Sequence, residues 1–245
     1  MLSGGGARGL AHLGIIKALF AIGIKVEKIS GVSTGAVAGA FIAAGFSPED
    51  ALKIFVENKL MHQIRPGFNA GIFSIKKWEK ILLNCFPTNS FEALTIPLII
   101  NATDINACKT DYFSSGELVL PLMASCSIPG IFEPILFNES QYIDGGVLNN
   151  LPVEPFLMED RKIIASHVNP IAIEKGINSA AKILERSVHL SLRDETNSRK
   201  KCAHILLEPE ELTKFQIFDL EDAEEIFEIG YFYTMARRKE LEKLL

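Results

Sequence analysis

The chain has 245 residues, of which 48% are hydrophobic and 22% are charged, and its net charge is -5. This composition is typical of a globular protein, and we predict a single domain over residues 1–245. Lysine and arginine form no cluster, so nucleic acid is not expected as a partner. The four cysteines have neither CxxC nor metal-ligand spacing, which predicts buried free thiols and no metal site: Cys85, Cys108, Cys126 and Cys202.

No signal peptide is expected, because Arg8 and His12 interrupt the apolar stretch near the start of the chain. The most apolar segment, Gly35–Phe46, is too short to span a bilayer. These features predict a cytoplasmic protein that is able to contact a membrane surface transiently. The sequence carries no indication of its oligomeric state.

Helices and strands alternate from the start of the chain. Residues 9–22 carry apolar side chains on a helical period, a short strand ends near Gly31, and residues 34–45 form a helix of small residues. Ser47 is placed to cap a further helix, because Pro48 and two acidic residues follow it.

The remainder of the chain continues this alternation. We predict a helix from Ser74 to about Phe86, an amphipathic helix over 179–196 and a helical C-terminal region over 210–245. Further strands are predicted at 96–105, 141–146, 161–168 and 203–209, with residues 110–119 pairing beside the first of them. Strands that alternate with helices predict an α/β sandwich with a mostly parallel sheet.

A G-x-S-x-G sequence lies between the first predicted strand and the small-residue helix. It consists of Gly31, Ser33 and Gly35 in the stretch GVSTG. A serine on a sharp strand-to-helix turn, flanked by small residues, is the context of a nucleophile elbow. The alternative is a tight turn whose glycines serve only the packing of helix on sheet.

A serine nucleophile needs a base, and histidine is the usual one. His167, His189 and His204 all follow Ser33, but no glycine or loop context marks any of them, so structural roles are the simpler interpretation. We expect His12 to pack within the first helix and His62 to be exposed. An esterase with a Ser-His-Asp triad remains the alternative.

One carboxylate is better marked than any histidine. Asp144 ends a predicted strand and precedes Gly145 and Gly146, whose tight turn would lift the carboxylate into a cleft. Aspartate is a weak base for a hydroxyl, unless burial raises its pKa and a hydrogen bond holds it on the serine. The alternative is an ordinary Asp-Gly turn.

The glycine loop near the start of the chain has the spacing G-x-G-x-x-G. Backbone N–H groups of Gly4, Gly5 and Gly6, at the start of a helix, favour either a phosphate or the oxyanion of a tetrahedral intermediate. Arg8 would support either charge, whereas Gly9 is expected to serve packing.

A dinucleotide-binding protein needs an acid about 20 residues after the loop. Glu27 has that spacing but precedes a strand instead of ending one. A Walker A loop is excluded, because no Gly-Lys-Ser/Thr sequence follows the glycines.

Taken in order, these motifs resemble the patatin-like phospholipase family. The resemblance runs from residue 2 to about residue 155 and weakens toward 218–234. One difference is that only Met1–Ser3 precede the glycine loop, where the family usually has a full first strand. The stretches that carry it are GGGARG, GVSTG, ASCSIPGIFEP, DGG and NNLPV.

This resemblance implies a three-layer α/β/α sandwich and a lipid ester substrate, of the phospholipid or lysophospholipid class. Ser33 would attack the ester, Asp144 would accept its proton without a histidine, and an acyl-enzyme would form. An oxyanion hole would come from the loop of Gly4–Gly6 and Arg8, with Thr34. The resemblance implies no cofactor and no metal.

Residues 61–78 are irregular and apolar, and include Phe68 and Trp78. Core packing at a helical edge is the simpler interpretation, and a lid or the lining of an acyl channel is the alternative. A protein that binds lipids without hydrolysing them would carry the same motifs, and this function stays open beside the hydrolase.

Overall fold

The computed structural model describes residues 1–58, 76–171, 177, 183, 186–187, 190–216 and 220–245. Its α-helices are α1 (Ala11–Ile22), α2 (Thr34–Ala43), α3 (Pro48–Glu57), α4 (Lys76–Cys85), α5 (Val119–Ser125), α7 (Arg193–Lys200), α8 (Ala223–Ala236) and α9 (Arg238–Leu241). Its strands are β1 (Ile29–Gly31), β2 (Leu98–Asp104), β3 (Lys109–Phe113), β4 (Ile135–Phe137), β5 (Ser140–Asp144), β6 (Ile164–Ser166) and β7 (Ile205–Leu207).

Strand β2 lies at the centre of the sheet that positions the site. On one edge it pairs with β3, and on the other it pairs first with β1 and then with β5. The register shows this arrangement, because Ile100 pairs with both Gly31 and Phe113, whereas Ala102 pairs with both Asp144 and Asp111. Strands β1 and β5 therefore meet end to end along one edge of β2.

The sheet is mixed, so the predicted parallel direction holds for only one half of it. Leu2 bridges Gly31 and Ser166 in parallel and so joins β1 to β6, which is itself parallel to β7. Strands β3, β4 and β5 are antiparallel to their neighbours. The predicted pairing of residues 110–119 with the central strand is confirmed for residues 110–113, which belong to β3.

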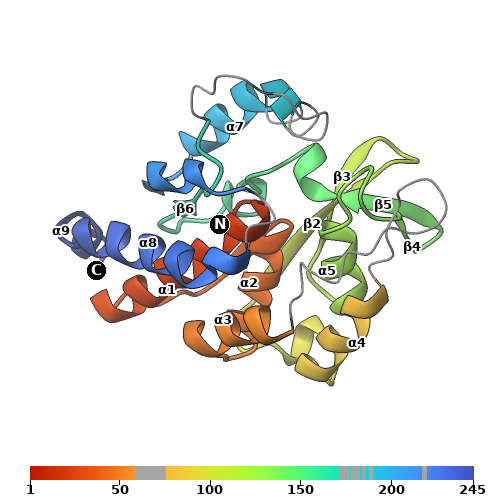
Figure 1. Cartoon of the computed structure of the whole chain (residues 1–245), viewed down its shortest axis with the longest axis horizontal. Coiled ribbons are helices and arrows are strands. Elements are labelled where there is room, and N and C mark those ends of the chain that lie inside the picture. Colours follow the sequence, from red (N-terminus) through yellow and green to blue (C-terminus); the bar gives the residue numbers. More distant parts are fainter. Residues whose placement is uncertain (59–75, 172–176, 178–182, 184–185, 188–189, 217–219) are drawn as a thin grey trace.

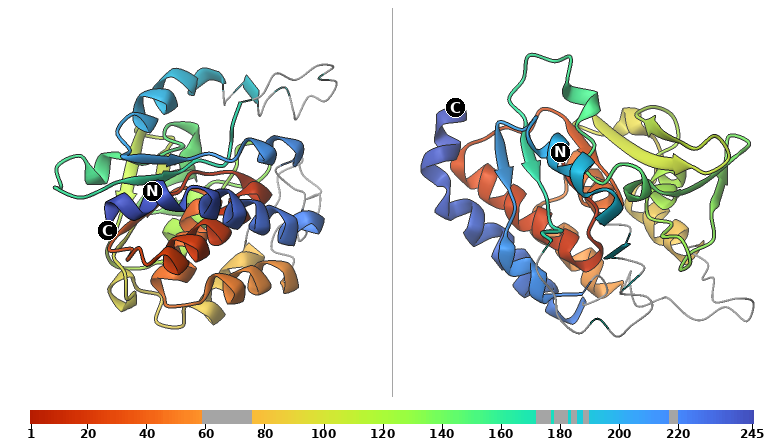
Figure 2. Two further views of the ribbon diagram at one scale, coloured as in Figure 1. Left: turned by 90° about the vertical axis from the view of Figure 1, so that its left-hand side faces the viewer. Right: turned by 90° about the horizontal axis from the view of Figure 1, so that it is seen from above.

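Helices and core segments cover both faces of the sheet, as the α/β sandwich requires (Figure 2). Ile205 and Leu207 of β7 pack against Ile15 and Leu19 of α1 on one face. Ala165 of β6 points to the other face, where it joins a separate cluster with Leu151, Val153 and Phe156. This division follows from the alternation of side chains along a strand.

Helices α1 and α8 lie side by side, although they come from opposite ends of the chain (Figure 1). A Cβ placed on Gly14 would lie 1.9 Å from the Phe227 carbonyl oxygen, and one on Gly230 would lie 2.2 Å from that of Ala11. Glycine thus allows the two backbones to touch, and the C-terminal helix becomes part of the same core.

Local predictions agree with the structure where the signals are strong. Ser47 caps α3 by accepting a hydrogen bond of 3.0 Å from the Asp50 N–H. The C-terminal region is helical as predicted, but it breaks at Arg237 into α8 and α9. Of the helix predicted over 179–196, residues 179–182, 184–185 and 188–189 lie outside the described part; residues 183, 186–187, 190–191 and 193–196 are helical, and α7 continues to Lys200.

Cys108 and Cys202 are exposed, so the expectation of buried thiols is wrong for these two. Of the segment 61–78, residues 61–75 lie outside the described part, and with them the lid interpretation, while Trp78 is buried against Phe132. None of the described helices is both long and apolar enough to cross a bilayer.

Candidate active site

Ser33 occupies a strained turn between β1 and α2. Its φ of 52° lies in a region that side chains rarely adopt, as expected of an elbow that lifts a serine out of the sheet. The Ser33 N–H donates to the Ser125 hydroxyl at 2.8 Å, which holds the turn. Gly35 is required here, because a Cβ at this position would lie 2.4 Å from the Ser3 carbonyl oxygen.

The end-to-end meeting of β1 and β5 brings Asp144 to Ser33. Their last residues pair with Ile100 and Ala102, which are about 7 Å apart along β2. The Ser33 side chain lies close enough to the Asp144 carboxylate to lower its pKa by hydrogen bonding. Two side chains separated by 111 positions in the sequence are therefore in contact because two strands share one edge of a third.

The surroundings of Asp144 make its carboxylate a better base than an exposed one. Burial raises the pKa of Asp144 from 3.8 to about 6, while hydrogen bonds from Ser33 and from the Gly146 N–H limit the rise. The bond from the Gly146 N–H to Oδ1 measures 2.7 Å. At neutral pH the group is therefore largely ionised, and it can accept a proton from the serine.

The glycine loop runs beside the serine: a Cβ on Gly4 would lie 3.2 Å from Ser33 Cβ. The Gly4 N–H donates to Asn150 Oδ1 at 3.1 Å, so the expectation that Gly4 itself holds an oxyanion needs correction. The N–H groups of Gly5 and Gly6 precede the first hydrogen-bonded turn and have no partner within the described chain. They are the donors available to a negative charge.

Thr34 and Arg8 are the other two residues that were expected at the oxyanion hole. The Thr34 N–H, at the start of α2, is likewise without a backbone partner in the described residues. The Arg8 guanidinium donates to the Phe215 carbonyl at 2.8 Å and to Asn169 at 3.4 Å, so it ties the loop to the C-terminal region. A Cβ on Gly9 would lie 2.2 Å from Thr34 Oγ1, which agrees with the packing predicted for Gly9.

The described histidines have partners other than Ser33. His12 is buried, which lowers its pKa to about 3; Nε2 donates to the Ser3 carbonyl at 2.8 Å, and Nδ1 accepts from the Ser166 hydroxyl. His167 Nδ1 bonds Glu208 at 2.8 Å, and His204 Nδ1 accepts from the Ile163 N–H. The triad alternative is thus unsupported by the described histidines; His62 and His189 lie outside the described residues.

The dinucleotide alternative also lacks support. Glu27 lies at the amino end of β1, whereas the glycine loop passes its carboxyl end, and its carboxylate forms an ion pair with Arg161. Among the described residues, no group of histidine, cysteine and acidic side chains is arranged to hold a metal ion.

Several residues of the site carried no clear signal in the sequence. Ser125 holds the elbow, the thiol of Cys126 contacts the Ser33 side chain, and Asn169 donates to the Gly4 carbonyl at 2.6 Å. Ser125 and Cys126 were marked only as part of the ASCSIPGIFEP stretch, and Asn150 only as part of NNLPV. Each of these contacts joins residues more than 90 positions apart, and that of Asn169 joins residues more than 160 apart. A local sequence pattern therefore cannot predict them.

The fold and the site define an α/β protein with a serine–aspartate pair at a strand-to-helix elbow. Residues 1–157 match the sequence profile of patatin-like phospholipases. The chain belongs to the patatin-like phospholipase family. This match includes the glycine loop, the elbow and Asp144.

Individual relatives agree with this assignment. The chain is 36% identical to an uncharacterized NTE family protein of Mycobacterium bovis over 157 residues, which is 63% of this chain and 44% of that protein. It is 26% identical to lysophospholipase NTE1 of Kluyveromyces lactis over 270 aligned residues, covering 95% of this chain and 18% of the relative. The chain thus spans less than half the length of these relatives.

The fold also resembles a solved structure. VipD from Legionella pneumophila superposes with a TM-score of 0.58 at 17% sequence identity, over 97% of this chain and 66% of VipD. At this identity the likeness concerns the fold alone, and it extends beyond the family match into the C-terminal helices.

Proposed function

We propose that this protein is a serine acyl hydrolase that cleaves carboxylic esters of lipids. The observation that carries the proposal is the strained Ser33 next to the buried Asp144 carboxylate, whose pKa the Ser33 side chain lowers, beside N–H groups of Gly5 and Gly6 that have no partner among the described residues. A nucleophile, a base and oxyanion donors are the three parts that acyl transfer needs. A separate cofactor has no place in this scheme.

The reaction proceeds in two steps. Asp144 accepts the Ser33 hydroxyl proton as Oγ bonds to the ester carbonyl carbon, and Gly5, Gly6 and Thr34 N–H groups hold the oxyanion. The ester C–O bond then breaks, and the leaving alcohol takes the proton from Asp144. A water molecule next gives its proton to Asp144 and attacks the acyl-enzyme; the fatty acid leaves, and Ser33 regains its proton.

The names of the relatives support a lipid substrate, and lysophospholipid is the class we propose. The relative from Kluyveromyces lactis is named a lysophospholipase, as is one from Aspergillus fumigatus with 30% identity over 174 residues. That activity is named for proteins much longer than this chain, of which the aligned parts make up 18% and 11%.

Labelling with a fluorophosphonate tests the mechanism. We expect the wild-type protein to be labelled once, at Ser33, and Ser33→Ala to lose both the label and hydrolysis of 1-acyl lysophospholipids, by about 10⁴-fold or more. Ser114→Ala, which removes an exposed serine, is the matched control and should behave as wild type. Labelling or hydrolysis that survives Ser33→Ala would refute the proposal.

A further inference from the structure

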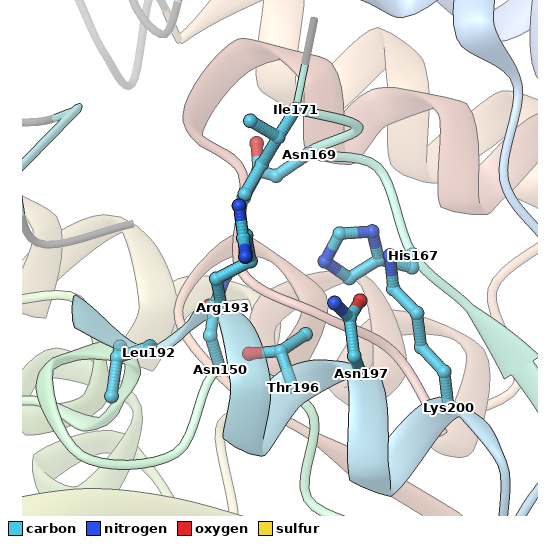
Figure 3. Close-up of a pocket in the computed structure, with 9 residues that line it drawn as sticks. All are labelled: Asn150, His167, Asn169, Ile171, Leu192, Arg193, Thr196, Asn197 and Lys200. Carbon is cyan, nitrogen blue, oxygen red and sulfur yellow. The ribbon is translucent and has the colours of Figure 1, made fainter. Parts of the chain in front are cut away.

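A polar pocket adjoins the oxyanion loop (Figure 3). Its polar wall comprises Asn150, His167, Asn169, Arg193, Asn197 and Lys200. Two of these side chains hold one residue of the loop: Asn150 accepts from the Gly4 N–H, and Asn169 donates to the Gly4 carbonyl. The pocket and the reacting centre thus share a wall.

Nitrogen donors from α7 face this pocket. Figure 3 shows Arg193 extending from the helix toward Asn169, and the Asn197 amide pointing toward the ring of His167. Among the described residues, the titratable side chains that line the pocket are basic, namely His167, Arg193 and Lys200. Lys200 forms a close ion pair with Glu208 at 2.5 Å. Arg193 has only a 3.4 Å contact with the exposed Asp194, so its guanidinium can still bind an anion in the pocket.

His167 contributes an acceptor to the same pocket. Although burial raises the pKa of Glu208, hydrogen bonds from His167 and Lys200 outweigh it and lower the pKa to about 2, so Glu208 is a carboxylate. A carboxylate only accepts hydrogen bonds, so Nδ1 of His167 carries the proton. Burial lowers the pKa of His167, and in the neutral ring Nε2 is left as an acceptor without a partner among the described residues.

We infer that this pocket binds the headgroup of the lipid ester, and that the headgroup is a phosphorylated polyol. Phosphate oxygens would accept from Arg193 and Asn197, because a guanidinium is suited to phosphate. A hydroxyl of the polyol would donate to Nε2 of His167. This inference rests on the proposed function and specifies its substrate: a glycerol backbone would link the ester at Ser33 to the phosphate across the wall formed by Asn150 and Asn169.

Two substrates with the same acyl chain separate this inference from a general effect on catalysis. One is 1-acyl lysophosphatidylglycerol, and the other is the corresponding monoacylglycerol, which lacks phosphate. We expect Arg193→Gln and Asn197→Ala each to raise the ratio of the two KM values, lysophospholipid over monoacylglycerol, about tenfold. Arg238→Gln is the control, because Arg238 is an exposed residue of α9 that pairs with Glu242.

Ligand binding to inactive protein gives a readout that is independent of turnover. In Ser33→Ala, sn-glycerol 3-phosphate should raise Tm, inorganic phosphate should raise it less, and addition of Arg193→Gln should abolish both shifts. Equal shifts with the two ligands would contradict recognition of the polyol.

An unchanged KM ratio in Arg193→Gln would overturn the headgroup site, even where Ser33→Ala is inactive and the proposed function stands. A loss that is equal for the two substrates would overturn it as well, since that points to a structural role. Failure of the proposed function would show instead as hydrolysis that survives Ser33→Ala.

Discussion

At the scale of single residues, the reactivity of this site depends on one buried carboxylate. Asp144 lies next to Ser33 in a position where water is largely excluded, and this burial raises its pKa to about 6. A base whose pKa lies near the working pH combines ionisation with proton affinity. The same property gives rise to two measurable effects.

The first effect concerns the rate. Because only the ionised carboxylate accepts the Ser33 proton, kcat/KM should fall about tenfold per pH unit below the pKa of Asp144, which is about 6, and level off above it. A pH–rate profile with a soluble p-nitrophenyl ester measures this. An acid limb centred near 4, the range of an exposed aspartate, would contradict the prediction.

The second effect concerns stability. The folded state binds the Asp144 proton more tightly than the unfolded state, so wild-type stability falls as pH rises from about 4 to about 6. Asp144→Asn removes this effect. At pH 7 its free energy of unfolding should exceed that of the wild type by up to about 3 kcal/mol, whereas below pH 4 this gain should be absent. Urea unfolding at the two pH values is the test; a variant less stable at pH 7 would refute it.

At the scale of elements, close approach of backbones decides the packing. Helices α1 and α8 touch at Gly14, where an added methyl group would collide with a backbone carbonyl that has no freedom to move aside. In α2, Gly39 faces the side chains of Ile29 and Leu98, at 2.9 and 3.2 Å from an added Cβ, and side chains adjust more easily.

We therefore expect Gly14→Ala to destabilise the protein by more than about 2 kcal/mol, whatever it gains in helix propensity. Gly39→Ala is the matched control and should cost less stability than Gly14→Ala, because its added methyl group meets side chains and not a backbone carbonyl. Thermal or denaturant unfolding compares the two. Similar stability of both variants would show that α1 and α8 are less tightly packed than described.

At the scale of the whole molecule, the C-terminal helix belongs to the same core as the site. Phe227 of α8 is buried in the main core cluster, whereas Phe232 of the same helix is 62% exposed. Arg8 of the glycine loop donates to the carbonyl of Phe215, in the segment that precedes α8. Loss of α8 packing should therefore also disturb the glycine loop at the active site.

Phe227→Ala should cost about 3–5 kcal/mol, and ester hydrolysis and helical circular dichroism should be lost in one shared transition at lower temperature. Phe232→Ala should leave both midpoints close to wild type. Hydrolysis that persists after the helix of Phe227→Ala has melted would contradict a single cooperative unit over 1–245, which remains a prediction.

Features encoded in short stretches were predictable from the sequence. Ser33 follows a strand and precedes a small-residue helix, and Asp144 ends a strand before two glycines, as the local patterns indicated. The occupied N–H of Gly4 and the carbonyl partner of Arg8 were not predictable, since Asn150 and Phe215 lie 146 and 207 positions away.

The sequence by itself determined the positions of the elbow, the glycine loop and the aspartate turn, because turns and helix starts depend on neighbouring residues. Only the tertiary structure decided that β1 and β5 meet along one edge of β2, which places Ser33 on Asp144. It also decided which loop N–H groups lack a partner within the described part of the chain, and that α7 brings Arg193 and Asn197 to a pocket beside them. The physical reason is that burial, and with it the pKa of Asp144, depends on contacts between segments far apart in the chain.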